Sequence, residues 1–299
     1  MATGDHAVST AFHAVSTLLL VLAFSSVLAS CSSTGELSDP DAFRIATFNV
    51  HYLSLRDDTM DWPGRRDAVA RVLEEIDADI VAFQEMETFG GGSFHTENRQ
   101  LDFVLDRLPE MRAAAVGDPE TYPSTQPVLY RASRFEALDQ GFFFFSPTPD
   151  EIYSRPWHAR FPAFASWVRL RDTTSRATFT VYNVHFDAQS PRNRLKSAHL
   201  VVNRLISRPY PDDPVIVTGD FNAPSFFPTM RTLLDAGLHR APTSGSTYHF
   251  NRGINLIPGI DHILGSRSIR FDGTTVIRRS YGGRFPSDHY PVVARVALE

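Results

Sequence analysis

Apolar residues along the chain gather in short runs that are typical of buried β-strands. Most of these runs are apolar throughout, which is the pattern of strands covered on both faces of a sheet. The predicted strands span residues 44–51, 80–84, 163–170, 177–185, 214–218, 260–265, 274–278 and 292–298.

Between these runs the apolar positions recur with the period of an α-helix. Residues 69–76 and 195–205 carry apolar side chains at i, i+3, i+4 and i+7 spacing or close to it, which predicts two amphipathic helices. A third helix is predicted over residues 229–236, where Gly237 takes the position that ends a helix. Strands outnumber helices, and neighbouring strands near the chain ends look like hairpins. We therefore expect a layered α/β sandwich with mixed sheets rather than a doubly wound parallel sheet.

The N-terminal segment has the pattern of an export signal. Residues 18–29, LLLVLAFSSVLA, form an apolar run too short to span a bilayer comfortably. Ser30 and then Cys31, the only cysteine, follow the run, and LASC resembles the lipobox of bacterial lipoproteins. We expect residues 1–30 to be a lipoprotein-type signal peptide and Cys31 to be lipidated, although a lone cysteine is more often a small buried hydrophobe.

One feature of the signal departs from the usual pattern. Residues 1–17 contain no Lys or Arg, whereas a signal peptide normally begins with positive charge. A mis-assigned start codon and an uncleaved anchor remain as alternatives. In each case we expect an exported protein, either held at the cell envelope by a lipid anchor or secreted. Residues 31–42 are predicted to be a flexible tether, and residues 43–299 a single domain.

The composition is that of an ordinary globular protein. The chain has 299 residues, of which 42% are hydrophobic and 21% charged, which excludes a disordered, collagen-like or disulfide-built protein. The net charge of -5 provides no overall positive field, so binding of nucleic acid by bulk counterion release is disfavoured. Nucleic acid stays on the list of possible partners, although the net charge does not favour it. We expect a monomer.

Several predicted strands end in polar residues of the same kind. Asn49 and Glu85 follow two apolar runs, and Asp220 follows a third. Loops at strand ends are where a rigid scaffold presents functional groups. Carboxylate and amide oxygens are the ligands of Mg²⁺, so Glu85 with Asn49 predicts a site for a divalent cation.

Six short motifs follow one another along the chain. The motifs are Thr47-Phe48-Asn49-Val50, Gln84-Glu85, Asn183-Val184-His185, Gly219-Asp220-Phe221-Asn222, Ile260-Asp261-His262-Ile263 and Pro286-Ser287-Asp288-His289-Tyr290-Pro291-Val292. In this order they resemble the endonuclease/exonuclease/phosphatase superfamily. Each motif alone is weak, but the shared order and spacing make coincidence improbable. The resemblance covers residues 43–299. It implies a DNase I-like fold, a four-layer α/β sandwich with two packed mixed β-sheets flanked by helices.

The resemblance also implies roles for particular residues. Asp220 would orient or deprotonate the attacking water, and Asn222 would donate hydrogen bonds to phosphate oxygens. His289 would act in proton transfer or stabilise the phosphate, with Asp261 fixing its tautomer. His185 would bind a non-bridging phosphate oxygen.

The remaining implied roles concern the metal and the support of the site. Asp288 would join Glu85 and Asn49 on the metal side. Asn183, Asp187 and His262 would have supporting roles only.

Two further features have alternative explanations. The aromatic run 142–145 can form a stacking wall for lipid or bases, but alternating Phe residues more simply bury one face of a sheet. Relatives often carry a Pro-Arg pair where this chain reads Phe161-Pro162-Ala163. Arg160 or Arg131 is therefore a candidate substitute for contacting phosphate.

The predicted function is metal-dependent hydrolysis of a phosphoester, with Mg²⁺ or, as an alternative, Mn²⁺ as cofactor. By family resemblance a phosphodiester of nucleic acid or of a phospholipid headgroup is favoured. The alternative substrate is a phosphomonoester, such as an inositol phosphate-like compound or another organic ester. An alternative of another class is a surface binding module without activity, but none of the central residues is missing.

Overall fold

The computed structural model describes residues 41–54, 60–86, 97–155, 157 and 161–299, all within one compact unit. Twelve strands and four helices are assigned among these residues. The predicted signal peptide, Cys31 and nearly all of the predicted tether lie outside them. The first strand begins at Phe43. Among the described residues, none of the helices combines the length and the apolar character that crossing a membrane requires.

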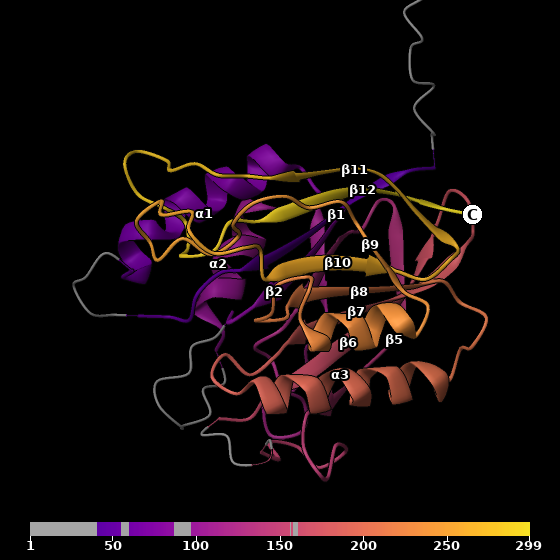
Figure 1. Cartoon of the computed structure of the whole chain (residues 1–299). Helices are drawn as coiled ribbons and strands as arrows, with labels where there is room; N and C mark the ends of the chain where they lie inside the picture. The colour runs from indigo at the N-terminus through magenta and orange to yellow at the C-terminus, as the bar shows by residue number, and fades with distance from the viewer. Residues whose placement is uncertain (1–40, 55–59, 87–96, 156, 158–160) are drawn as a thin grey trace, which may run out of the picture. The chain divides into compact units, whose positions relative to one another are not determined.

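The first sheet has six strands in the order β11-β12-β1-β2-β4-β3. Figure 1 labels β11, β12, β1 and β2. β1 and β2 are parallel, and the other neighbours are antiparallel, so the sheet is mixed. Its strands are β1 (Phe43–Asn49), β2 (Ile80–Gln84), β3 (Met111–Ala114), β4 (Val128–Arg131), β11 (Ile269–Val276) and β12 (Val292–Leu298).

The second sheet also has six strands, in the order β5-β6-β7-β8-β10-β9. Only β7 and β8 are parallel. Its strands are β5 (Phe135–Phe144), β6 (Phe164–Asp172), β7 (Thr178–His185), β8 (Val215–Asp220), β9 (His239–Arg240) and β10 (Asp261–Gly265).

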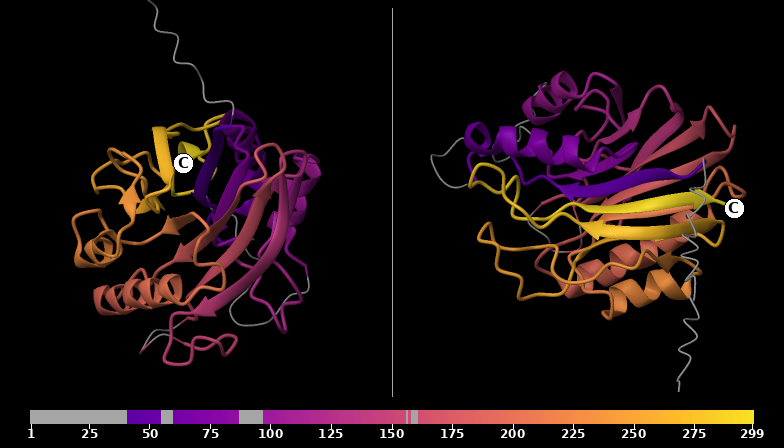
Figure 2. Two further views of the ribbon diagram at one scale, coloured as in Figure 1. Left: turned by 90° about the vertical axis from the view of Figure 1, so that its right-hand side faces the viewer. Right: turned by 90° about the horizontal axis from the view of Figure 1, so that it is seen from above.

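Three layers of apolar side chains hold the elements together. The inner layer lies between the sheets, where Phe43 and Ile45 of β1 pack in one cluster with Phe179 and Val181 of β7. Each outer layer joins a sheet to two helices. The ribbon views of Figure 2 show helices on the outer sides of the sheets. The helices are α1 (Trp62–Ile76) and α2 (Arg99–Arg107) on the first sheet, and α3 (Pro191–Ile206) and α4 (Pro228–Asp235) on the second. The predicted four-layer sandwich of two mixed sheets is therefore confirmed.

The ends of α1 and α4 follow local sequence signals. Asp61 caps the start of α1 by accepting a hydrogen bond from the backbone N–H of Gly64, and a proline occupies the first turn. Gly237 follows α4 with φ of 95°, a left-handed conformation that glycine adopts without strain. The predicted end of this helix is confirmed.

The predicted elements miss mainly the edges of both sheets. The edge strands β3, β5 and β9, the inner strand β4 and helix α2 were not predicted, and the edge strand β11 begins at Ile269 rather than at residue 274. Most of these elements are short or half-exposed, so their apolar pattern is weak. In β5 and β11 the strand register also shifts, between Ala137 and Asp139 and between Phe271 and Gly273, which interrupts the alternation. Of the aromatic run 142–145, Phe143, Phe144 and Phe145 are buried, so the simpler core explanation holds.

Candidate active site

The space between the two sheets changes from apolar to polar toward one end. Along β1, Phe43 and Ile45 face this space, and alternation of side chains along a strand places Thr47 and Asn49 on the same face. The same change occurs on β2, β7 and β8, which end in polar residues. The structure brings the eight predicted site residues of the domain together at this end; they are Asn49, Glu85, His185, Asp220, Asn222, Asp261, Asp288 and His289.

His289 lies between two buried carboxylates. Its Nδ1 is 3.0 Å from Oδ2 of Asp261, and its Nε2 is 3.8 Å from Oδ2 of Asp220. All three residues are more than 90% buried. Asp261 and Asp220 are directly paired in the antiparallel ladder of β10 and β8, which places both carboxylates at one edge of the second sheet. The ladder therefore defines a carboxylate–imidazole–carboxylate group.

The charges in this group shift its pKa values in defined directions. Burial, and next the negative charge of Asp261, raise the pKa of Asp220 to about 6, while the two histidines His289 and His185 oppose the rise. Burial by itself lowers the pKa of His289, but the charges of Asp261 and Asp220 and the hydrogen bond with Asp261 raise it well above its ordinary value. His289 is therefore cationic near neutral pH, with its Nδ1–H donated to Asp261.

Oxygen atoms gather beside this group on the first sheet. The amide nitrogen of Asn49 donates to Oε1 of Glu85 and to Oδ2 of Asp220, both at 3.1 Å. Nδ1 of His51 lies 3.7 Å from Oε2 of Glu85 and 3.5 Å from Oδ1 of Asp288. Glu85 and Asp288 thus flank one imidazole, and Asn49 connects the oxygen-rich side with Asp220.

The side chains of Glu85, Asn49 and Asp288 suit a divalent cation by their chemistry. Carboxylate and amide oxygens are the hard ligands that Mg²⁺ and Mn²⁺ prefer. Among the described residues, Asp220, Asp261 and His289 have ligand atoms within 4.8 Å of one another, close enough for a metal. A cationic imidazole has no free lone pair, however, so His289 is better described as a hydrogen-bond donor than as a ligand.

The residues predicted to contact phosphate lie around Asp220. Nε2 of His185 is 3.7 Å from both Glu85 and Asp220. The backbone N–H of Asn222 donates to Oδ1 of Asp220, and its side-chain amide donates one hydrogen bond to the carbonyl of Phe186. An amide nitrogen has two N–H groups, so the second N–H of Asn222 remains for a substrate oxygen.

Backbone conformations at the site are unusual. His51, Glu85 and Asn222 have φ values of 60°, 58° and 48°, in the left-handed region that non-glycine residues seldom adopt. Gly219 has φ of 142°, and a Cβ at that position would be 2.0 Å from the carbonyl oxygen of Val184 on the neighbouring strand. The glycine before Asp220 is therefore required by the close approach of β7 and β8.

Three predicted supporting residues lie around the site. Asn183 is fully buried and exchanges hydrogen bonds with Gln84 and with the carbonyl of Phe83, which joins the two sheets behind the site. His262 is buried, and its Nε2 lies 2.9 Å from the carbonyl of Ala223. Asp187 accepts hydrogen bonds at the start of α3, including one from Ser190.

Arg65 is a residue near the site that the sequence prediction missed. Its side chain is fully buried in α1, and its guanidinium donates to the carbonyls of Val50, His51 and Pro286, among others. It thus joins the loop after Asn49 to the loop before His289. A usable signal was present, because Arg65 lies three residues after Trp62 on the apolar face of the helix.

His51 and Tyr248 were also missed. The ring of Tyr248 packs against that of His289, with centroids 4.9 Å apart. His51 carried a usable signal, since it follows Asn49 by two positions at the end of a strand. Tyr248 carried none, because only the folding of its loop brings it to the site.

The proposed phosphate contact by Arg131 is wrong. Arg131 pairs with Asp77 at 2.7 Å and with Asp79 at 3.1 Å, next to the start of β2. Glu85 follows the other end of that strand, so Arg131 lies away from the site. The prediction erred because strand direction, and not sequence position, decides which end of a sheet a side chain occupies. Arg160 lies outside the described residues.

The chain belongs to the Endonuclease/Exonuclease/phosphatase family, whose model matches residues 46–289. Solved structures share the fold. An endonuclease/exonuclease/phosphatase family protein from Bacteroides thetaiotaomicron superposes with a TM-score of 0.75 at 24% identity, covering 86% of this chain and 98% of the other. The mannosyl-6-phosphatase of Bacteroides thetaiotaomicron VPI-5482 gives 0.74 at 24% identity, with 86% and 100% covered.

More distant structures share the same architecture. TDP2 of D. rerio, complexed with a single-strand DNA product, gives a TM-score of 0.63 at 14% identity, with 86% and 99% of the two chains covered. No curated protein sequence matches the chain.

Proposed function

We propose that this protein is a divalent-metal-dependent phosphoesterase that hydrolyses a phosphodiester. One observation carries the proposal. The Asp261–His289–Asp220 group lies at the same end of the sheets as the carboxylate of Glu85, and the amide nitrogen of Asn49 donates to both Glu85 and Asp220. Metal-assisted hydrolysis of a phosphoester uses a general acid–base group beside oxygen ligands for a divalent cation.

The residues divide the work of hydrolysis between them. Asp220, with a pKa of about 6, is ionised near neutral pH and still basic enough to orient and deprotonate a water molecule. Cationic His289 and the second N–H of Asn222 provide hydrogen-bond donors where negative charge grows on the phosphoryl group. His185 provides a further ring nitrogen 3.7 Å from Asp220.

The metal would be held by Glu85, Asn49 and Asp288. A divalent cation bound there supplies neutralisation of phosphate charge and stabilisation of the leaving oxygen. Mg²⁺ is the proposed ion, with Mn²⁺ as the alternative.

The fold alone does not choose the substrate, because one scaffold hosts many substrates through its loops. Neighbours of the same fold include a mannosyl-6-phosphatase and a protein with a DNA product. A nucleic acid or phospholipid diester is the first proposal, and a monoester is the second.

The first test is turnover by wild type and by Asp220→Ala, with Mg²⁺, Mn²⁺ or a chelator. The substrates are plasmid DNA, sphingomyelin, bis(4-nitrophenyl) phosphate and 4-nitrophenyl phosphate. Losing the base that activates water is expected to reduce the rate by about 100-fold or more without unfolding the protein. The exposed Asp212→Ala is the control and is expected to behave as wild type.

Two outcomes of this test contradict the proposal. Wild-type turnover by Asp220→Ala would remove Asp220 from the mechanism. No turnover of any substrate, in a folded protein that binds the metal, would favour a binding module on the same fold.

We further propose that the enzyme is exported and held at the cell envelope as a monomer, through a lipid on Cys31. The basis is the apolar run that ends in LASC. Thioether lipidation requires the thiol, so Cys31→Ser is expected to move the protein from the membrane fraction to the soluble fraction. An unchanged membrane fraction would point to an uncleaved anchor instead.

A further inference from the structure

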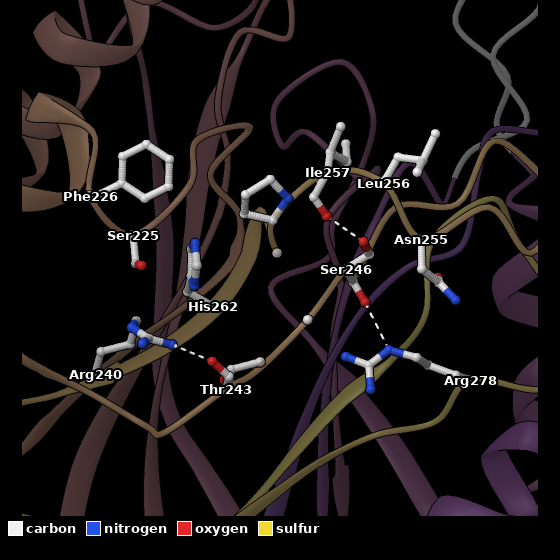
Figure 3. Close-up of a pocket in the computed structure, with 13 residues that line it drawn as sticks. Ser225, Phe226, Arg240, Thr243, Ser246, Asn255, Leu256, Ile257, His262 and Arg278 are labelled. Atoms are coloured by element: carbon white, nitrogen blue, oxygen red, sulfur yellow. Dashed lines mark hydrogen bonds between the residues drawn. The ribbon is translucent and has the colours of Figure 1, made fainter.

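A pocket of about 580 Å³ lies on the outer side of the second sheet, beside β9 and β10 (Figure 3). Ser225 and Phe226 of the loop after β8 form one side. Thr243, Gly245, Ser246 and residues 255–259, all in the loop between β9 and β10, form the other. Two arginines complete the wall, Arg240 at the end of β9 and Arg278 after β11. A volume of this size suits a small organic ligand.

Both arginines lack an acidic partner. No carboxylate of the described residues lies within 4.0 Å of either guanidinium. One terminal nitrogen of Arg240 donates to the carbonyls of Ala241 and Thr243, both at 3.2 Å, and no described group accepts from its Nε or its other terminal nitrogen. Burial lowers the pKa of Arg240, with no nearby charge to oppose the effect. The pocket thus holds a partly desolvated cation with unused N–H donors.

Arg278 approaches the pocket from the opposite side. Its Nε donates to the carbonyl of Ser246 at 3.0 Å, and one terminal nitrogen donates to the carbonyl of Ser244. These bonds orient the guanidinium toward the pocket, as Figure 3 shows, and its remaining terminal nitrogen has no described acceptor. Arg278 thereby has two roles, because its side chain positions the loop of Ser246 and also places a positive charge in the pocket wall.

The rest of the lining is neutral. Ser225 and Thr243 contribute hydroxyl groups, and His262 contributes an imidazole. Burial lowers the pKa of His262 to about 4, so its ring is uncharged near neutral pH, and its Nδ1 has no hydrogen-bond partner. Phe226 and Leu256, which are 59% and 83% exposed, form an apolar rim. Two cations, several neutral polar groups and an apolar rim favour an oxyanion attached to an organic group.

The pocket is separate from the catalytic group, although the two share a strand. His262 follows Asp261 on β10, and successive side chains point to opposite faces of a strand. Asp261 faces His289 between the sheets, whereas His262 contacts Phe221 and Ala223 on the outer side. An anion in the pocket therefore occupies a different place from the phosphoester that is hydrolysed.

We propose that this pocket binds the phosphate or carboxylate group of a small organic molecule, through Arg240 and Arg278. Arg240 supplies its Nε and its second terminal nitrogen, Arg278 supplies its remaining terminal nitrogen, and the rim of Phe226 and Leu256 packs on the organic part. The oxyanion is either a second anionic group of the substrate or part of a separate molecule. The chemistry of recognition is the same for both, and binding at the pocket is independent of the hydrolase activity.

The test measures calorimetric binding of inorganic phosphate and of phenylphosphonate to the metal-free protein. Arg240→Gln/Arg278→Gln is expected to weaken binding of both probes at least tenfold. Arg267→Gln, an exposed arginine after β10, is the matched control and is expected to bind as wild type. Because the double variant removes hydrogen bonds to the loop, Ser225→Glu is measured as well. It keeps both arginines but adds a negative charge to the pocket wall, so it is also expected to abolish binding.

Equal affinities in wild type and in the pocket variants would overturn the proposal, and so would the absence of binding by wild type.

A measurement of turnover then identifies the source of the oxyanion. The double variant is compared with wild type on 5′-phosphorylated thymidine dinucleotide and on bis(4-nitrophenyl) phosphate. A tenfold higher KM for the dinucleotide, with unchanged kcat, assigns the pocket to a second phosphate of the substrate, provided that the kinetics on bis(4-nitrophenyl) phosphate are unchanged. Unchanged KM for both, with binding lost, assigns it to a separate ligand. If wild type hydrolyses neither compound, the proposed activity fails while the binding result stands.

Discussion

Asp261 illustrates how one carboxylate controls the chemistry of a neighbouring ring. Its oxygens lie 3.2 and 3.0 Å from Nδ1 of His289, and its charge is the largest of the influences that raise the pKa of that imidazole. The carboxylate therefore holds the ring in one orientation and in its cationic form. Without it, burial lowers the pKa of His289, and Nε2 becomes a weaker hydrogen-bond donor.

We expect Asp261→Asn to reduce kcat by about 100-fold or more, because an amide carries no charge to stabilise cationic His289. The measurement is steady-state turnover on the best substrate of the wild type. Asp235→Asn, an exposed aspartate at the end of α4, is the control. A rate within a factor of about two of wild type would show that the charge of Asp261 is not required.

The left-handed conformations of Glu85 and Asn222 are a second feature at the scale of residues. Each such conformation costs about 1 to 3 kcal/mol when the residue is not glycine. Both residues carry side chains that glycine cannot provide, a carboxylate at Glu85 and an amide at Asn222. The strain is thus accepted at the two positions where the site needs a functional group.

Helix α1 positions the site through Arg65. A helix usually turns an apolar stripe toward a sheet, but here the stripe contains a buried guanidinium that donates to carbonyls of two loops. These carbonyls belong to the loops that follow Asn49 and precede Ser287. The guanidinium of Arg65 therefore donates hydrogen bonds to buried carbonyls in irregular loops, where a helix or sheet would provide backbone N–H donors.

We expect Arg65→Gln to lower the free energy of unfolding by about 3 kcal/mol or more, because each buried carbonyl left without a donor costs about 1 to 3 kcal/mol. Urea denaturation measures the change. Arg71→Gln, an exposed arginine one and a half turns further along the same helix, is expected to change stability by less than about 0.5 kcal/mol. Equal stabilities of the two variants would contradict the structural role of Arg65.

The four-layer arrangement buries polar groups as well as apolar ones, and this gives the whole molecule a pH-dependent stability. Burial lowers the pKa of His262 to about 4, against 6.5 for an exposed histidine. Between these pH values the unfolded chain binds a proton at this residue and the folded chain does not. The free energy of unfolding therefore falls as the pH decreases from 6.5 toward 4.

We expect His262→Phe to make this fall shallower, by up to about 1.4 kcal/mol per pH unit, since the variant has no proton to bind there. Urea denaturation across the range from 6.5 to 4 measures both slopes. Ser246→Ala removes another polar group of the same pocket without a titratable proton and is the control. Identical slopes for His262→Phe and wild type would show that the burial of His262 does not contribute.

The sequence by itself determined the layered α/β class, most of the inner strands and the eight residues that meet at the polar end of the sheets. These features were predictable because β1, β2, β7 and β8 are short buried strands whose apolar runs end in polar side chains, and β10 begins with polar Asp261. Motifs such as Gly219-Asp220-Phe221-Asn222 also combine a backbone requirement with a functional group in neighbouring positions. Such local information needs no knowledge of the other strands.

The tertiary structure alone decided the edge strands, the direction in which Arg131 points, the burial of Arg65 and the pocket of Arg240 and Arg278. Edge strands are half-exposed and bulged, so their pattern is weak along the sequence. The other features depend on contacts between segments distant in sequence, such as Arg65 with Pro286. The free energy of such contacts comes from desolvation and hydrogen bonds that exist only after the sheets have packed.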